Sequence, residues 1–184
     1  MNMRSLIFCI GTALIGVTAQ AALGAEVFLI QVPNVAGDVI LAGYNNWISV
    51  DSFSAGFSNP DVPNGTGASA GKGICQPIQI QKTLDRTSPL LSAAAFQGTA
   101  FPTVTLTALA PLGSSYYPFL TFTLSDAVIS SLTMAGNGTA SAQDESLTLV
   151  YGKLTVSYSA VNPATGQVSV AATKTVDCIV GTVN

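Results

Sequence analysis

The chain has no histidine, which removes the usual general base, the usual activator of a serine or cysteine nucleophile, and the commonest metal ligand. Classical hydrolase triads are therefore excluded. The one adjacent pair of carboxylates, Asp144 and Glu145, is interpreted as a solvated turn, because neighbours along a strand point to opposite faces of a sheet. A glycine-rich phosphate loop between a strand and a helix is also lacking. We expect a protein that is not an enzyme, with no catalytic residue, cofactor or metal site.

Charged residues are scarce, at 8% of the chain against about a quarter in an average protein. The six Lys and Arg residues form no basic cluster, and the net charge is −3, so we expect no nucleic-acid partner. Hydrophobic residues make up 48% of the 184 residues, which is enough for a substantial core. Low charge with abundant threonine, serine, valine and glycine is typical of extracellular or self-associating β proteins.

The N-terminus has the pattern of a signal peptide. Arg4 precedes an apolar run, Ser5–Val17, that is too short to span a bilayer comfortably, and small residues follow it. Cleavage is expected after Ala21, or as late as Ala25. This predicts an exported protein, periplasmic or extracellular, with no membrane span after cleavage and one mature domain over residues 26–184. A buried N-terminal helix is the alternative.

Three cysteines are present, and Cys9 lies inside the predicted signal peptide. Cleavage leaves Cys75 and Cys178 in a chain that enters an oxidising compartment, where such a pair is normally bridged. We therefore predict a disulfide between Cys75 and Cys178. The alternative is two small buried hydrophobic side chains.

One short helix is predicted between two strands. In the first strand, Ile78 and Ile80 alternate with glutamines, and the glutamines and Lys82 are expected to face water. Pro89 fits the first helical position after Thr87 or Ser88, and Gly98 fits the end of the helix. After the helix, threonines at 103, 105 and 107 alternate with apolar residues, which predicts a strand with a threonine outer face.

The rest of the chain alternates between strands and turns. Strands are predicted at residues 26–32, 47–57, 120–132, 147–158 and 168–180, and a flexible loop at 61–73. The apolar positions change phase near Gly152 and Lys153, which predicts a β-bulge in a curved sheet. The fold class is therefore all-β, a barrel or a two-sheet sandwich, with one short α-helix.

Six groups of short motifs follow one another along the chain. They are Pro33–Gly37, Trp47–Ser54 with Gly56 and Ser58–Pro60, Ile80–Lys82 with Asp85–Leu90, Pro102–Leu106, Leu124–Ser131, and Glu145–Leu149 through Lys153–Leu154 to Tyr158. Each motif is weak alone, but the set is specific in its order. In this order, the segments resemble the haemolysin-coregulated protein (Hcp) family, the tube-forming subunits of type VI secretion.

The resemblance implies a β-barrel with a lateral helix, hexameric rings, stacking of the rings into a tube, and a lumen that carries small secreted effectors. It also implies that the 61–73 loop lies at the contact between rings. We take Asp61 and Asn64 of this loop, with Lys82, Asp85 and Arg86 before the helix, as candidate contacts between copies. A structural role inside the subunit is the alternative for the last three.

The chain departs from the family pattern in two respects. Family tube subunits lack a cleaved signal, and the family's histidine before the tryptophan and its late Gly-Trp-Asp segment are missing here. Together with the cysteine pair, this predicts an exported, disulfide-stapled branch that serves as a ring subunit or a secreted virulence factor. The alternative function is a monomeric binding module of the periplasm or cell surface, unconnected to a type VI apparatus.

Overall fold

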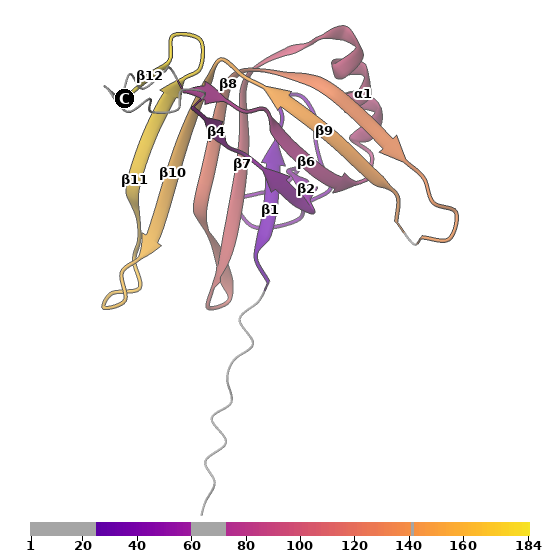
Figure 1. Cartoon of the computed structure of the whole chain (residues 1–184). Coiled ribbons are helices and arrows are strands. Elements are labelled where there is room, and N and C mark those ends of the chain that lie inside the picture. Colours follow the sequence, from indigo (N-terminus) through magenta and orange to yellow (C-terminus); the bar gives the residue numbers. More distant parts are fainter. Residues whose placement is uncertain (1–24, 60–72, 141) are drawn as a thin grey trace, which may run out of the picture.

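A computed structural model describes residues 25–59, 73–140 and 142–184. These residues form mostly β-strands with one short helix, so the predicted fold class is confirmed (Figure 1). The elements in chain order are β1 (Val27–Gln31), β2 (Ile48–Val50), β3 (Ser52–Ser54), β4 (Phe57–Ser58), β5 (Ile74–Cys75), β6 (Ile78–Thr83), α1 (Ser88–Gln97), β7 (Ala100–Leu112), β8 (Ser115–Ala135), β9 (Asp144–Val150), β10 (Lys153–Val161), β11 (Val168–Asp177) and β12 (Thr182–Val183).

Strand β8 closes the main sheet into a barrel because it pairs with three strands. Its first half lies between β7 and β10, and its second half pairs with β9. From β9 the hydrogen bonding continues to β6 and β3, and from β7 it continues to β1 and β2. Since only Asp51 separates β2 from β3, the two paths meet. Isoleucines, leucines and valines from these strands fill the interior, and β3 contributes Phe53.

Beyond the barrel, β7, β8, β10 and β11 continue as one antiparallel sheet. Figure 1 shows β10 and β11 on the side of the molecule away from α1. Strand β11 is at the edge of this sheet, and β12 covers only its end, at Val176 and Asp177. A second, two-stranded sheet consists of β4 and β5.

The helix begins and ends close to the predicted residues. Pro89 is in its first turn, and Gly98 ends it in the left-handed conformation with φ 63°, as glycine allows. Leu91 and Ala94 are buried on the side that lies against β8. Thr87 is the N-cap residue, but its side chain makes no capping bond. The hydroxyl of Ser88 instead accepts the backbone N–H of Asp85 at 3.2 Å.

The predicted strand at 47–57 is three short strands, β2, β3 and β4. Trp47 precedes β2 and is not part of it; its ring packs edge-on against Tyr44 at 5.1 Å. Asp51 does not interrupt the hydrogen bonding altogether, since its backbone N–H donates to the carbonyl of Gln81 in β6. The short strands let the chain pass from β1 to β6, which closes the barrel.

The predicted bulge near Gly152 is wrong. Val128 pairs with Val150 and Ser125 pairs with Lys153, so the same number of residues lies between these pairs on both strands. No residue is inserted on one strand alone between these pairs; the nearby register shift lies in β8, between Ile129 and Ser131.

The alternation of buried and exposed residues changes at this point in both β8 and the opposite strand, β9 with β10. In β8, Leu124 and Ala127 are both buried, and Asp126 between them has a φ of 54°. On the other strand, Tyr151 and Gly152 separate β9 from β10. The register is kept while the buried positions switch from even to odd along β8 and from odd to even along β9 and β10.

Candidate functional site

Serine and threonine side chains from four neighbouring strands form one face of the extended sheet. Cross-strand partners lie on the same side of a sheet, so the register places these residues in adjacent rows. We call this surface the hydroxyl face. Its members are Thr103, Thr105 and Thr107 on β7, Thr121, Thr123 and Ser125 on β8, Thr155 and Ser157 on β10, and Thr173 and Thr175 on β11. Thr107 is buried, and the other members are partly or fully exposed.

Several of these hydroxyl groups pair across strands. The hydroxyls of Thr155 and Thr175 are 2.8 Å apart, and Thr173 donates to Ser157 at 3.0 Å. The charges of Lys153 and Asp177 also lie on this face and pair with each other at 3.3 Å. The face is therefore polar without a net charge.

The carboxylate of Asp177 also orders the turn that follows β11. It accepts hydrogen bonds from the backbone N–H groups of Val180 and Ile179. The Val180 bond lowers the pKa of Asp177 from its ordinary value, and Lys153 and the Ile179 bond add to this effect over a smaller opposing contribution from burial. This end of β11 is thus fixed in place by a charged cap.

Lys82 lies inside the subunit. Its side chain is fully buried, and its Nζ lies 2.8 Å from Glu145 Oε2, 3.0 Å from Asp85 Oδ1 and 2.8 Å from the carbonyl of Thr83. The prediction that Lys82 faces water is wrong, because positions 78, 80 and 82 share one face of β6. Its charge is satisfied inside the chain, contrary to the prediction that it contacts another copy.

Glu145 is fully buried on β9, so its interpretation as part of a solvated turn is wrong. Its Oε2 accepts hydrogen bonds from Lys82 and, at 2.6 Å, from the hydroxyl of Ser88 at the start of α1. Its Oε1 is buried and receives no hydrogen bond from the part of the chain that the structure describes. The spacing of Glu145 from the buried Leu147 and Leu149 is a sequence signal for this position.

Asp85 organises the start of the helix. Its carboxylate accepts hydrogen bonds from the backbone N–H and the hydroxyl of Thr87, while its own N–H donates to Ser88 at 3.2 Å. Burial raises the pKa of Asp85, but hydrogen bonds from Thr87 and Lys82 outweigh burial and lower the pKa below its ordinary value of 3.8. Asp85 is therefore held ionised in the folded chain.

We expect Asp85 to make folding stability depend on acid pH. Because its folded pKa is lowered, its contribution is present above the unfolded pKa, about 3.9, and is lost as the pH falls towards the folded value. Denaturant titrations of the wild type and Asp85→Asn between pH 3 and 7 measure this. The difference in the free energy of unfolding should shrink as the pH falls below about 4. A difference independent of pH would contradict it.

Arg86 is exposed and holds the turn that contains Gly37. Its guanidinium donates to the carbonyls of Ala36, at 3.1 Å, and Gly37, and it pairs with Asp38 at 2.8 Å. Among the candidate contact residues in the described ranges, Arg86 is the one with its charge at the surface. Asp61 and Asn64 lie outside those ranges.

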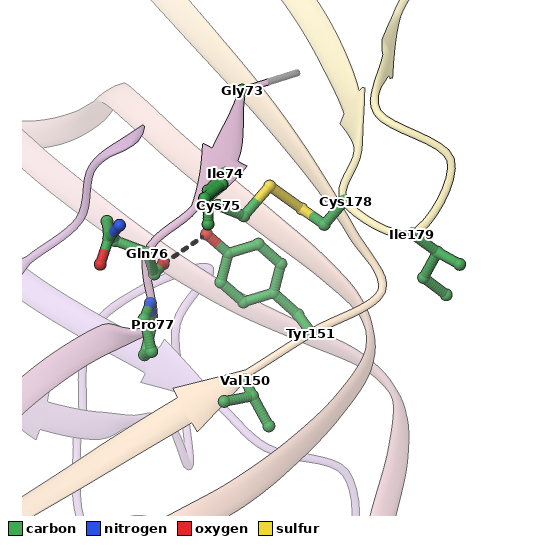
Figure 2. A pocket seen from close by; sticks show the side chains of 9 residues that line it. All are labelled: Gly73, Ile74, Cys75, Gln76, Pro77, Val150, Tyr151, Cys178 and Ile179. Carbon is green, nitrogen blue, oxygen red and sulfur yellow. Dashed lines mark hydrogen bonds between the residues drawn. A yellow bond between two sulfur atoms is a disulfide. The ribbon is translucent and has the colours of Figure 1, made fainter. Parts of the chain in front are cut away.

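The structure joins Cys75 and Cys178 by a disulfide, with Cα atoms 5.7 Å apart. The bridge opens onto a cavity of ≈370 Å³, shown in Figure 2, which is also lined by Ile74, Tyr151 and Ile179. Burial raises the pKa of Tyr151, and its hydroxyl donates to the carbonyl of Gln76 at 2.9 Å. The cavity therefore lies between β5 of the small sheet, the end of β9 and the turn after β11.

Residues 25–59, 73–140 and 142–184 contain no cluster of three or more acidic or cysteine side chains that could hold a metal ion. They also contain no helix long and apolar enough to cross a membrane.

Comparison with known proteins identifies the family. The family model described as "Type VI secretion system effector, Hcp" matches residues 29–158. A solved structure described as a type six secretion system protein is 23% identical, with 87% of this chain and 100% of that chain covered and a TM-score of 0.80. No curated protein matches in a sequence search.

Two other solved structures have the same fold. Hcp1 from Salmonella typhimurium is 16% identical, with 88% of this chain and 100% of that chain covered and a TM-score of 0.68. A type VI secretion system effector from Yersinia pestis is 20% identical, with 82% of this chain and 98% of that chain covered and a TM-score of 0.61. Because the family match runs from β1 through most of β10, this chain belongs to the Hcp family of type VI secretion effectors.

Proposed function

We propose that this chain is an exported, non-enzymatic subunit that assembles into hexameric rings, which stack into a tube that carries small secreted effectors. The observation that carries the proposal is the hydroxyl face, which extends across four strands to the open edge of β11. Membership of the Hcp family supports self-assembly. The apolar run and small residues at the N-terminus support export to the periplasm or the cell exterior.

The edge of β11 supports contacts between copies. In the described part of the chain, residues Val168–Thr173 have a strand neighbour on one side, β10. Monomeric proteins usually protect such an edge with charged residues, proline or a covering segment. Here Lys174 is the one charged residue before Asp177, and Val170 is 65% exposed. A strand of a second copy can satisfy the unpaired backbone groups of this edge.

The neutral surface also sets the expected dependence on salt. Long-range attraction between charged surfaces weakens as salt screens it, whereas hydrogen bonds and apolar contacts between neutral surfaces do not depend on such attraction. We therefore expect assemblies of this chain to persist at high salt.

Light scattering and negative-stain imaging across a dilution series test the proposal on secreted protein whose N-terminus has been sequenced. Rings are expected at protein concentrations of tens of micromolar, roughly the dissociation constant expected for an interface of standard size. They are also expected in high salt. Val170→Lys should raise the half-assembly concentration about tenfold or more, because lysine blocks edge pairing.

The matched control is Phe96→Lys, which places the same charge at a 95% exposed position on α1, across the molecule from β11 (Figure 1). This variant should assemble like the wild type. A wild-type chain that is monomeric at these concentrations would contradict the proposal and favour a monomeric binding module.

A further inference from the structure

The disulfide connects two peripheral parts of the fold that are far apart in sequence. Cys75 is in β5 of the small two-stranded sheet, and Cys178 directly follows β11, the edge strand of the hydroxyl face. The β4–β5 sheet is separate from the main sheet in its hydrogen bonding. The bridge therefore fastens a small sheet and the end of an edge strand to each other at one end of the barrel.

In the described residues, few noncovalent contacts run between the β5 segment and the end of β11, although the carboxylate of Asp177 orders the turn after β11 itself. The Tyr151 hydroxyl bonds to the Gln76 carbonyl at 2.9 Å, and the backbone N–H of Cys178 donates to the carbonyl of Gly152 at 2.9 Å. The neighbouring apolar side chains pack only partly, since Ile74 is 50% exposed and Ile179 is 75% exposed. Segments with so little buried apolar surface open with a low free-energy cost once a covalent tie is removed.

The bridge is also accessible. Both cysteines are only partly buried, and their sulfur atoms lie beside the ≈370 Å³ cavity seen in Figure 2. A small thiol can therefore reach the disulfide without unfolding of the barrel. Thiol–disulfide exchange proceeds by attack of a thiolate on one sulfur, so this access is what reduction in the folded state requires.

We propose that the Cys75–Cys178 bridge is a redox latch that keeps β5 and the β11–β12 region in place for self-association. A dithiol reductant opens it by two successive exchanges. The reductant is oxidised to its own disulfide, and two electrons and two protons pass to the sulfur atoms of Cys75 and Cys178. Copies of the reduced chain then have to order this region when they associate, and that entropy cost weakens the contact.

This inference rests on the proposed self-assembly and adds a condition to it. The chain associates fully only in an oxidising compartment, such as the one to which a signal peptide directs it. Premature assembly before export is then disfavoured, because the latch is open while the cysteines are reduced.

Hydrogen exchange tests the first step. Exchange is measured by mass spectrometry on the oxidised wild type, the wild type in dithiothreitol, and Cys75→Ser/Cys178→Ser. Peptides from β5 and β11–β12 should exchange about tenfold faster or more in the last two samples, while peptides from β6 and β9 stay protected. Equal protection of β5 and β11–β12 in all three samples would overturn the latch. Removal of dithiothreitol with reoxidation should restore protection, which separates opening from misfolding.

Self-association tests the second step on the same samples. The half-assembly concentration should rise about tenfold or more on reduction, and dithiothreitol should have no effect on the double variant. Equal assembly of oxidised and reduced chains would overturn the inference while leaving the proposed function intact. An oxidised wild type that stays monomeric would overturn the proposed function, and the inference with it.

Discussion

Gly37→Ala is expected to destabilise the fold strongly. A Cβ atom at this position would lie 2.0 Å from the carbonyl oxygen of Trp47 and 2.7 Å from the backbone nitrogen of Ile48. Both are backbone atoms, so no side-chain rotation can relieve the contact. The loop also cannot shift easily, because Gly37 donates its N–H to Asn46 at 2.7 Å and Arg86 binds its carbonyl. We expect a loss of about 3 kcal/mol or more in the free energy of unfolding, measured by denaturant titration.

Gly56→Ala is the matched control, because a Cβ atom there has no neighbour within 4 Å and the backbone φ is not in the left-handed region. It should change the free energy of unfolding by less than about 1 kcal/mol. If Gly37→Ala were as stable as Gly56→Ala, the close approach between the 36–38 turn and the start of β2 would not exist in solution.

The sequence predicts local structure well where polar and apolar residues alternate along a strand, or where a proline or glycine marks the end of an element. Threonines at every second position of β7 predict its outer face correctly at Thr103 and Thr105, whereas Thr107 is buried. Pro89 and Gly98 predict the two ends of the helix. The hydroxyl face as a whole could not be predicted in this way. It depends on the register between β7, β8, β10 and β11, and register is set by pairing between segments distant in the chain.

Other features were missed for different physical reasons. Asp126 with φ 54° looks like any aspartate in the sequence, so the matched phase change opposite Gly152 was interpreted as a bulge in one strand. Charged residues are rarely buried, so the sequence predicts Lys82 in water, although its spacing from Ile78 and Ile80 indicates the buried face. Its partner Glu145 lies 63 residues away, and nothing local in the sequence links the two.

The buried pair of Lys82 and Glu145 is expected to have a large effect on stability when one partner is removed. Lys82→Met keeps the length and apolar stem of the side chain but leaves the Glu145 carboxylate fully buried without its cation. The hydroxyl of Ser88 alone then compensates the charge poorly. We expect a loss of about 3–5 kcal/mol in the free energy of unfolding.

The double variant Lys82→Met/Glu145→Met distinguishes the pair from its separate parts. With both charges gone, the site becomes an apolar contact between β6 and β9, whose register places the two residues directly opposite each other. Replacing a buried ion pair by packed apolar side chains is often neutral or stabilising, so the double variant should recover most of the loss. The control is Asp38→Asn, which removes the exposed ion pair with Arg86 and should cost less than about 1 kcal/mol. Comparison of the two single variants with the double variant gives the coupling energy of the pair. Additive losses of stability would contradict a coupled pair. A coupling energy of about 2 kcal/mol or more would show that the two charges hold β6 and β9 together beneath the start of the helix.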